Sequence, residues 1–154
     1  MDRTDKKILT LLQNNGRISN QELADEVSLS PSPCLRRVNQ LEKGGFIEKY
    51  VALLNPEKIN LHLSGFLFVG LDKHTPQKMK NFEANVKKIP EVMECYLITG
   101  QSADYVLKVI VSDMQHYQKF LLERITQMEG VTSVHTSFVL QKIVDKTMYS
   151  LEFA

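Results

Sequence analysis

The stretch ISNQELADEVSLSPSPCLRRVNQLEKGGF, residues 18–46, decides how the first third of the chain folds. Ser19 and Glu22 have the spacing of a capping box, in which each side chain binds the free backbone amide of the other at a helix start. Ser30 and Pro31 then open a further helix, because serine is a good N-cap and proline is tolerated at the first helical position. The stretch therefore predicts two helices that follow each other across a tight turn.

Apolar residues on both sides of this turn predict a three-helix unit. Residues 3–13 carry apolar side chains at helical spacing, and Gly44-Gly45 ends the last helix. Residues 46–51, FIEKYV, are predicted to form a strand after it. Three short helices with a tight second turn are typical of a helix-turn-helix. The residues expected to face inward are Ile8, Leu9, Leu11, Leu12, Leu23, Ala24, Val27, Leu35, Val38 and Leu41.

The third helix, residues 30–44, carries polar side chains away from its apolar stripe. An arginine there can hold a guanine edge or a phosphate through two hydrogen bonds, and Asn and Gln can read adenine. We therefore predict double-stranded DNA as the partner, with a solvated basic face as the alternative. Cys34 is expected at the exposed start of the helix, with a structural role rather than a redox role. The candidate DNA-binding residues are Ser32, Pro33, Arg36, Arg37, Asn39 and Gln40.

The composition is that of an ordinary globular protein. The chain has 154 residues, of which 43% are hydrophobic and 24% charged, and a net charge of +1. This balance does not favour indiscriminate binding of nucleic acids, so a few well-placed cations must position any DNA. No apolar run approaches the length of about 20 residues that spans a bilayer, and the start MDRTDKKIL is charged. We expect a cytoplasmic protein that makes no contact with membranes.

The second half of the chain alternates strand and helix patterns. Continuous apolar runs predict strands, and apolar residues at helical spacing predict helices between them. The order is βαββαβ, two βαβ units in succession. The predicted strands cover residues 65–71, 92–99, 105–111 and 131–143, and the predicted helices cover about 79–89 and 114–128.

Both faces of the predicted sheet are apolar. In the first strand Leu67 and Val69 alternate with Phe66 and Phe68, and residues 105–111 show the same pattern. Two helices can cover only one face of a four-stranded sheet, and a monomer would expose the other face as a patch of several hundred Å². The sequence therefore predicts a homodimer in which a second copy covers the open face.

The segment GQSADY, residues 100–105, joins the second and third predicted strands and suits a small zwitterion. A turn that begins at Gly100 offers backbone amides to a carboxylate, and Asp104 offers an anion to an ammonium group. An α-amino acid has both groups. The alternative is an ordinary hairpin turn without a ligand.

Patterns typical of enzymes are missing. The four histidines are scattered one per segment, and the two cysteines form neither a disulfide framework nor a zinc spacing. No nucleophile elbow, phosphate loop or persuasive pair of carboxylates is found. We therefore expect no catalytic residue, no metal and no cofactor.

The run from Ile18 to Pro56 closely resembles the DNA-binding region of the leucine-responsive regulatory protein (Lrp/AsnC) family of transcription regulators, and the match continues through nearly all 154 residues. The resemblance implies an α+β fold, with a winged-type helix-turn-helix followed by a ferredoxin-like βαββαβ domain of the RAM/ACT-like kind. It implies domains over residues 1–50 and 64–154 with a linker over 51–63. It also implies sheet-to-sheet dimers that assemble further into an octamer or a similar ring.

The same resemblance assigns an effector site. The GQSADY loop resembles the family's Gly-x-x-Asp-Tyr segment, with one additional residue between the glycine and the aspartate. The apolar positions that match the family's site suit an aliphatic or thioether side chain, so leucine or methionine is the expected effector. The candidate effector-binding residues are Leu97, Gly100, Ser102, Asp104, Tyr105, Met114, Val134 and Thr136.

Two alternative functions remain open from the sequence. Sirohaem decarboxylases share this two-domain architecture, so the fold alone does not exclude catalysis. They would need His and Arg residues for a tetrapyrrole, whereas the pair Arg36-Arg37 on a third helix opened by an N-cap favours regulation. The other alternative is an amino-acid-binding module without affinity for DNA.

Overall fold

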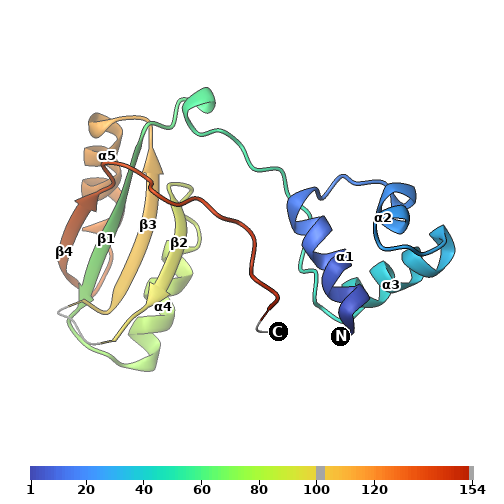
Figure 1. Cartoon of the computed structure of the whole chain (residues 1–154). Coiled ribbons are helices and arrows are strands. Elements are labelled where there is room, and N and C mark those ends of the chain that lie inside the picture. The colour runs from blue at the N-terminus through green and yellow to red at the C-terminus, as the bar shows by residue number, and fades with distance from the viewer. Residues whose placement is uncertain (100–102, 153–154) are drawn as a thin grey trace. The chain divides into compact units, whose positions relative to one another are not determined.

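The computed structural model describes residues 1–99 and 103–152, which form two units (Figure 1). One unit contains Met1–Leu53 together with the C-terminal segment that begins at Ile143, and the other contains Leu54–Lys142. The domain bounds that the family resemblance implies place the C-terminal segment in the second domain. The structure groups it with the N-terminal helices instead.

Three helices make up most of the N-terminal unit: α1 (Arg3–Asn14), α2 (Asn20–Glu26) and α3 (Pro31–Lys43). The predicted capping box is confirmed at α2, where Ser19 and Glu22 bind each other's backbone amides. A second capping box, which the sequence analysis missed, opens α1 through Asp2 and Asp5. Free amides at both helix starts are thus satisfied by local side chains.

The buried side of α3 differs from the predicted one. Cys34 is fully buried, whereas Leu35 is 49% exposed, so the expectations for these two residues are wrong. Successive residues of a helix are about 100° apart, so the true stripe has the spacing i, i+4, i+7 of Cys34, Val38 and Leu41. Burial also raises the pKa of the Cys34 thiol, which makes it less reactive.

The strand predicted over residues 46–51 does not form within the chain. These residues pair with no other strand among those described, and the connector contains only a short 3₁₀ helix, Glu57–Ile59. A strand needs a neighbour for its backbone hydrogen bonds, which the alternation of side chains cannot supply. The connector instead exposes large apolar side chains, those of Val51, Leu53, Leu54 and Ile59.

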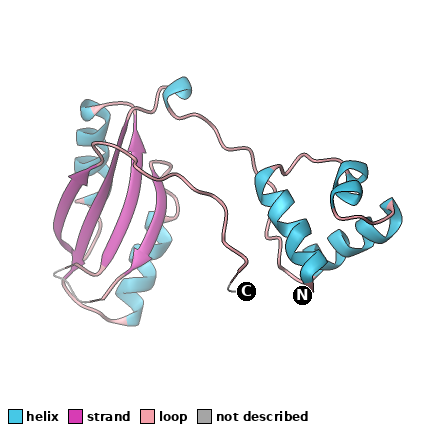
Figure 2. Ribbon diagram, in the orientation of Figure 1, coloured by secondary structure: helices cyan, strands magenta, loops and turns pink. Residues whose placement is uncertain are grey.

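The second unit has the predicted βαββαβ order and forms one antiparallel sheet with the strand order β2-β3-β1-β4 (Figure 2). The last strand ends at Phe138, five residues earlier than predicted, and α5 continues as a π-helical turn over Leu121–Ile125. The elements are β1 (Leu63–Leu71), α4 (Pro76–Val86), β2 (Val92–Leu97), β3 (Tyr105–Val111), α5 (Met114–Phe120) and β4 (Val131–Phe138).

Both helices of this unit pack on one face of the sheet (Figure 2). That face carries the alternate residues of β1 and β3, which pair in register, such as Leu67 with Leu107. The opposite face keeps Phe66 exposed and Phe68 only partly buried. A single chain therefore buries one side of its sheet and leaves an apolar surface on the other.

Candidate DNA-binding surface and effector region

The start of α3 is fixed by the turn that precedes it. Ser28 adopts a left-handed backbone conformation with a φ of 57°, which closes the turn between α2 and α3. The Asn20 side chain donates a hydrogen bond of 2.9 Å from Nδ2 to the carbonyl oxygen of Pro31. These contacts hold the first turn of α3 against the start of α2, as a helix that inserts its N-terminal residues into a groove requires.

The exposed side of α3 presents most of the predicted DNA-binding residues. Ser32, Arg36, Asn39 and Gln40 are exposed, and Pro33 is partly buried. Arg36 makes no hydrogen bond or ion pair with any other described residue, so its guanidinium is available to an external acceptor. The four exposed residues therefore offer a hydroxyl, two amides and one unpaired cation.

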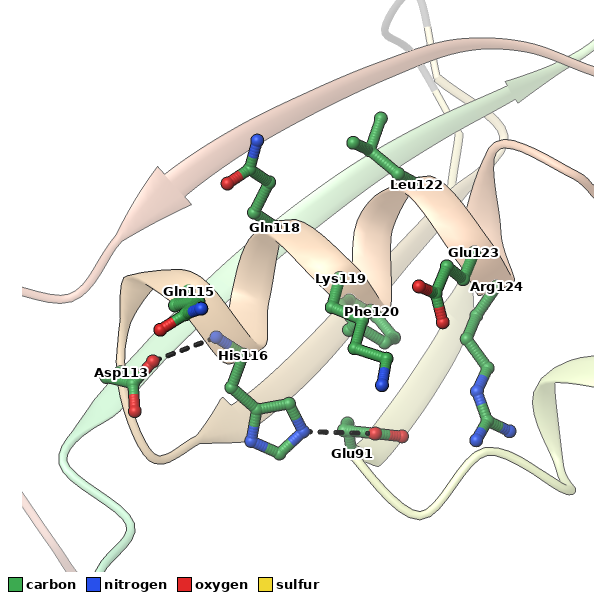
Figure 3. Close-up of a pocket in the computed structure, with 10 residues that line it drawn as sticks. All are labelled: Glu91, Asp113, Gln115, His116, Gln118, Lys119, Phe120, Leu122, Glu123 and Arg124. Atoms are coloured by element: carbon green, nitrogen blue, oxygen red, sulfur yellow. Dashed lines mark hydrogen bonds and ion pairs between the residues drawn. The ribbon is translucent and has the colours of Figure 1, made fainter.

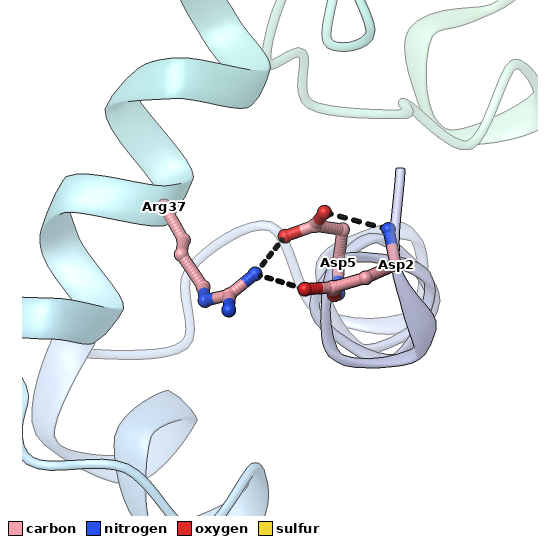
Figure 4. Close-up of polar contacts among 3 residues, drawn as sticks. All are labelled: Asp2, Asp5 and Arg37. Carbon is pink, nitrogen blue, oxygen red and sulfur yellow. Dashed lines mark hydrogen bonds and ion pairs between the residues drawn. The ribbon is translucent and has the colours of Figure 1, made fainter.

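Arg37 lies in a different environment (Figure 4). Its Nη1 atom is 2.7 Å from a carboxylate oxygen of Asp2 and 2.7 Å from one of Asp5, both at the start of α1. The amide of Asp5 and the guanidinium of Arg37 lower the pKa of Asp2 below its ordinary value of 3.8. Arg37 is thus engaged inside the unit and ties α3 to α1. The spacing of Asp2 and Asp5 is a sequence signal for the capping box of α1, and it does not point to Arg37.

Four of the predicted effector residues lie on the helix-covered face of the sheet, and three of them lie in one row. Leu97 pairs with Tyr105, Tyr105 with Val69, and Val69 with Val134, which forms one row across the four strands. Thr136 is in the next row, opposite Leu67, and its hydroxyl forms a hydrogen bond with Tyr117. This is the helix-covered face.

The exposure of these side chains differs strongly. Leu97 on the edge strand is 58% exposed, whereas Tyr105 is 1% exposed and donates a hydrogen bond of 2.9 Å to Glu83. Burial and the hydrogen bond to Glu83 raise the pKa of the Tyr105 phenol, which stays neutral. Leu97 is therefore accessible to a ligand in the single chain, and the Tyr105 ring belongs to the core.

Asp104 is held at the end of β1. One oxygen of its carboxylate accepts a hydrogen bond of 2.7 Å from the backbone amide of Leu71, and the other is 2.7 Å from Nε2 of His74. Its side chain keeps 23% of its surface exposed. Because a carboxylate has about four acceptor positions, it can still take a hydrogen bond from an ammonium group. Gly100 and Ser102 lie outside the described residues.

Met114 does not join this group within one chain. It begins α5 just after β3, whose end at Val111 pairs with Leu63, whereas the other end of β3 pairs with Val69. The two ends of β3 are six residue-to-residue steps apart, a distance of about 20 Å. Met114 is 54% exposed at the far end of the sheet. A site that includes both Asp104 and Met114 therefore requires two chains.

A groove of about 680 Å³ runs along α5 and shares no residue with the predicted effector set (Figure 3). Glu91 and His116 face each other there at 3.2 Å, and Lys119 and Arg124 extend beside them. Charges of both signs line this open surface, so it does not suit an aliphatic side chain.

No helix among the described residues has the length and apolarity needed to cross a membrane.

Comparison with protein families gives two matches. Residues 64–149 match the family described as the Lrp/AsnC ligand binding domain. Residues 1–48 match the family described as winged helix-turn-helix DNA-binding. The two matches together span most of the chain.

Individual relatives agree with these families. The leucine-responsive regulatory proteins of Salmonella typhimurium and Escherichia coli K12 are each 43% identical over 143 residues, which is 93% of this chain and 87% of theirs.

Among solved structures, a transcriptional regulator of Neisseria meningitidis in complex with L-methionine is 43% identical, with a TM-score of 0.95, over 99% of this chain and 98% of that one. An AsnC family regulator of Agrobacterium tumefaciens is 35% identical, with a TM-score of 0.93, over 99% of both chains.

Proposed function

The chain belongs to the Lrp/AsnC family of DNA-binding transcription regulators, and from this premise we propose that an amino acid controls its binding to operator DNA through its assembly. It is a regulator and not an enzyme, so the sirohaem-decarboxylase alternative is set aside. The observation that carries the proposal is the contrast between the polar, exposed side of α3 and the apolar, open face of the sheet. A protein whose partner is the chromosome works in the cytoplasm, where we place it.

The DNA contacts that we propose lie on the exposed side of α3. Arg36 binds a base edge or a phosphate, and Asn39 and Gln40 are placed to reach bases or the backbone, with Ser32 and Pro33 at the start of the helix. Arg37 forms ion pairs with Asp2 and Asp5 at the start of α1, and these hold α3 in place. It acts by positioning α3 and does not contact DNA in this proposal.

The open sheet face is the proposed dimer interface. Phe66, Phe68 and Ile110 lie on this face, and a second copy that packs sheet against sheet removes them from water. Burial of apolar surface yields roughly 25 cal/mol per Å², which favours a stable dimer. Two recognition helices related by twofold symmetry then read half-sites about one DNA turn apart, or a multiple of it. Dimers join further into an octamer or a similar ring.

Leucine or methionine is the proposed effector, at the Asp104 end of the sheet where one dimer meets another. The names of the relatives support this choice, since one group is leucine-responsive and a Neisseria regulator is bound to L-methionine. Asp104 accepts the ammonium group, and Gly100 and Ser102 provide donors for the carboxylate. Leu97 and Val134 offer apolar contacts, Thr136 and Tyr105 support them from within, and Met114 comes from a neighbouring subunit.

The test begins with a thermal-shift screen of the twenty amino acids. A ligand at a hundred times its dissociation constant stabilises the folded protein by about 2.7 kcal/mol. Operator duplexes are then selected from random DNA, and their affinity is measured with and without the amino acid that shifts the melting temperature. We expect leucine or methionine to raise the melting temperature and to change operator affinity about 5–150-fold, the usual range of allosteric coupling.

Two matched variants separate ligand binding from folding. Asp104→Asn keeps an acceptor for the Leu71 amide but loses the charge for the ammonium group, so the response is abolished and basal DNA binding stays. His74→Gln removes the contact between the His74 ring and Asp104 but keeps the carboxylate, so the response persists. The proposal fails if no amino acid at millimolar concentration has an effect, or if Asp104→Asn responds as the wild type does.

A further inference from the structure

Leu35 is an apolar side chain on the otherwise polar, exposed side of α3. It is 49% exposed and contributes nothing to the buried core of the N-terminal unit, whose α3 members are Cys34 and Leu41. Ser32 and Asn39 lie three residues before and four residues after it, so they are its neighbours on the helix surface. Leu35 thus lies among the side chains that face the proposed DNA.

The chemistry of Leu35 limits what it can recognise. It has no hydrogen-bonding group, so it can bind neither a phosphate nor the donors and acceptors that identify guanine, adenine and cytosine. The C5-methyl group of thymine is the apolar feature that a base pair presents in the major groove. The first turns of a recognition helix are the part that reaches base edges, and Leu35 is the fifth residue of α3.

We propose that Leu35 packs against the C5-methyl group of a thymine and makes the protein specific for thymine at that position of each half-site. The inference rests on the proposed docking of α3 in the major groove. Arg36, the next residue, lies at the centre of the exposed side and makes the polar contact beside it. The two residues contact neighbouring parts of the half-site: Arg36 supplies affinity, and Leu35 distinguishes thymine from cytosine.

The size of the effect follows from the methyl group alone. Burial of one methyl-sized group corresponds to about a fourfold change in an equilibrium constant. A symmetric operator contains the contact twice, so loss of both methyl groups weakens binding about fifteenfold if the half-sites act independently.

The test replaces thymine by deoxyuridine, which removes only the methyl group. Operators selected from random DNA with the wild-type protein are synthesised with each thymine replaced in turn, in one half-site and then in both. Affinities for the thymine and uracil duplexes are measured for the wild type, Leu35→Ala and Leu35→Met. Melting temperatures of the free proteins confirm that each variant is folded.

We expect one thymine per half-site whose replacement weakens wild-type binding about fourfold. Leu35→Ala loses this preference, so it binds the two duplexes equally, and Leu35→Met, which keeps an apolar side chain, retains most of the preference. The inference is overturned if no thymine shows the effect, or if Leu35→Ala shows the same ratio of thymine to uracil affinity as the wild type.

Arg36→Ala separates this inference from the proposed function. If Arg36→Ala prefers selected over random duplexes as strongly as the wild type does, the DNA-binding surface itself is misplaced. If selectivity depends on Arg36 while the thymine-to-uracil ratio does not depend on Leu35, the docking of α3 stands and the thymine contact alone is rejected.

Discussion

The two units of the chain differ in how completely they bury their apolar surface. The helices of the N-terminal unit close around Ile8, Leu23 and Cys34, and polar contacts fix α3 from several sides. The second unit has the larger core, yet one face of its sheet remains open, with Phe66 exposed. The helices of the first unit close their core within one chain, whereas the open sheet face of the second unit is the surface on which we propose that another copy packs.

The largest effect is expected at the open sheet face. Phe68→Asp places a carboxylate where we propose that a second sheet packs, and burial of an unpaired charge is too costly for such a dimer to persist. Light scattering at micromolar concentration should show a folded monomer for this variant and a dimer or larger assembly for the wild type. Leu122→Asp adds the same charge at an exposed position on the helix-covered side, and we expect it to stay dimeric. A folded monomer of the wild type would show that the open sheet face does not need a second copy.

The two adjacent arginines of α3 give the next largest effect. Arg36→Ala loses a contact to DNA worth about 1–3 kcal/mol, a factor of about 5–150 in operator affinity. Arg37→Ala leaves Asp2 and Asp5 without their cation, so it lowers the melting temperature of the free protein more than Arg36→Ala does. Gel-shift titrations and thermal melts of both variants measure this difference. Equal losses of operator affinity with unchanged melting temperatures would place both arginines on the DNA.

The contribution to stability of the Arg37–Asp2 ion pair, which joins α3 to α1, should depend on pH. The folded state lowers the pKa of Asp2, so its contribution to stability is complete above the ordinary value of 3.8 and is lost as the pH falls through the lower folded-state pKa. Asp2→Asn keeps a good N-cap but has no charge. The wild type should melt at a higher temperature than Asp2→Asn at pH 7, and the difference should vanish near pH 2. A difference that stays constant with pH would rule out the ion pair as its cause.

The smallest effect is expected where the C-terminal segment meets α1. The Gln13 side chain accepts a hydrogen bond of 2.7 Å from the Tyr149 amide and donates one of 3.2 Å to the Tyr149 carbonyl, and Leu151 packs against the core of the unit. Gln13→Ala should cost about 0.5–1.5 kcal/mol of stability, and Gln13→Glu, which keeps the acceptor, should cost less. Thermal melts of the two variants and of the wild type check this order. Equal melting temperatures for all three would show that the contact with the C-terminal segment does not stabilise the N-terminal unit.

Features that depend on local sequence were predicted well. The capping box of Ser19 and Glu22, the proline at the start of α3 and the βαββαβ order all follow from residues close together in the chain. The inward stripe of α3 was misplaced because Leu35 and Leu41 are six residues, or about 240°, apart and cannot share a face. Cysteine is also among the most frequently buried residues, which the pattern of aliphatic residues overlooks.

Features that depend on distant partners were not predicted. Residues 46–51 have the alternation of a strand but no strand beside them within the chain. The role of Arg37 is set by Asp2 and Asp5, more than thirty residues away. Met114 lies at the far end of the sheet from Asp104, and a pattern matched along one chain does not show which end of the sheet a residue occupies.

The central claim is that the amino acid acts on DNA binding through assembly. The most direct measurement is a titration of the wild-type protein with leucine or methionine, in which operator affinity and the mass of the assembly are recorded on the same samples. The account predicts that both change at the same half-saturating concentration and that Asp104→Asn shows neither change. A change in operator affinity of the wild type at constant mass would contradict it.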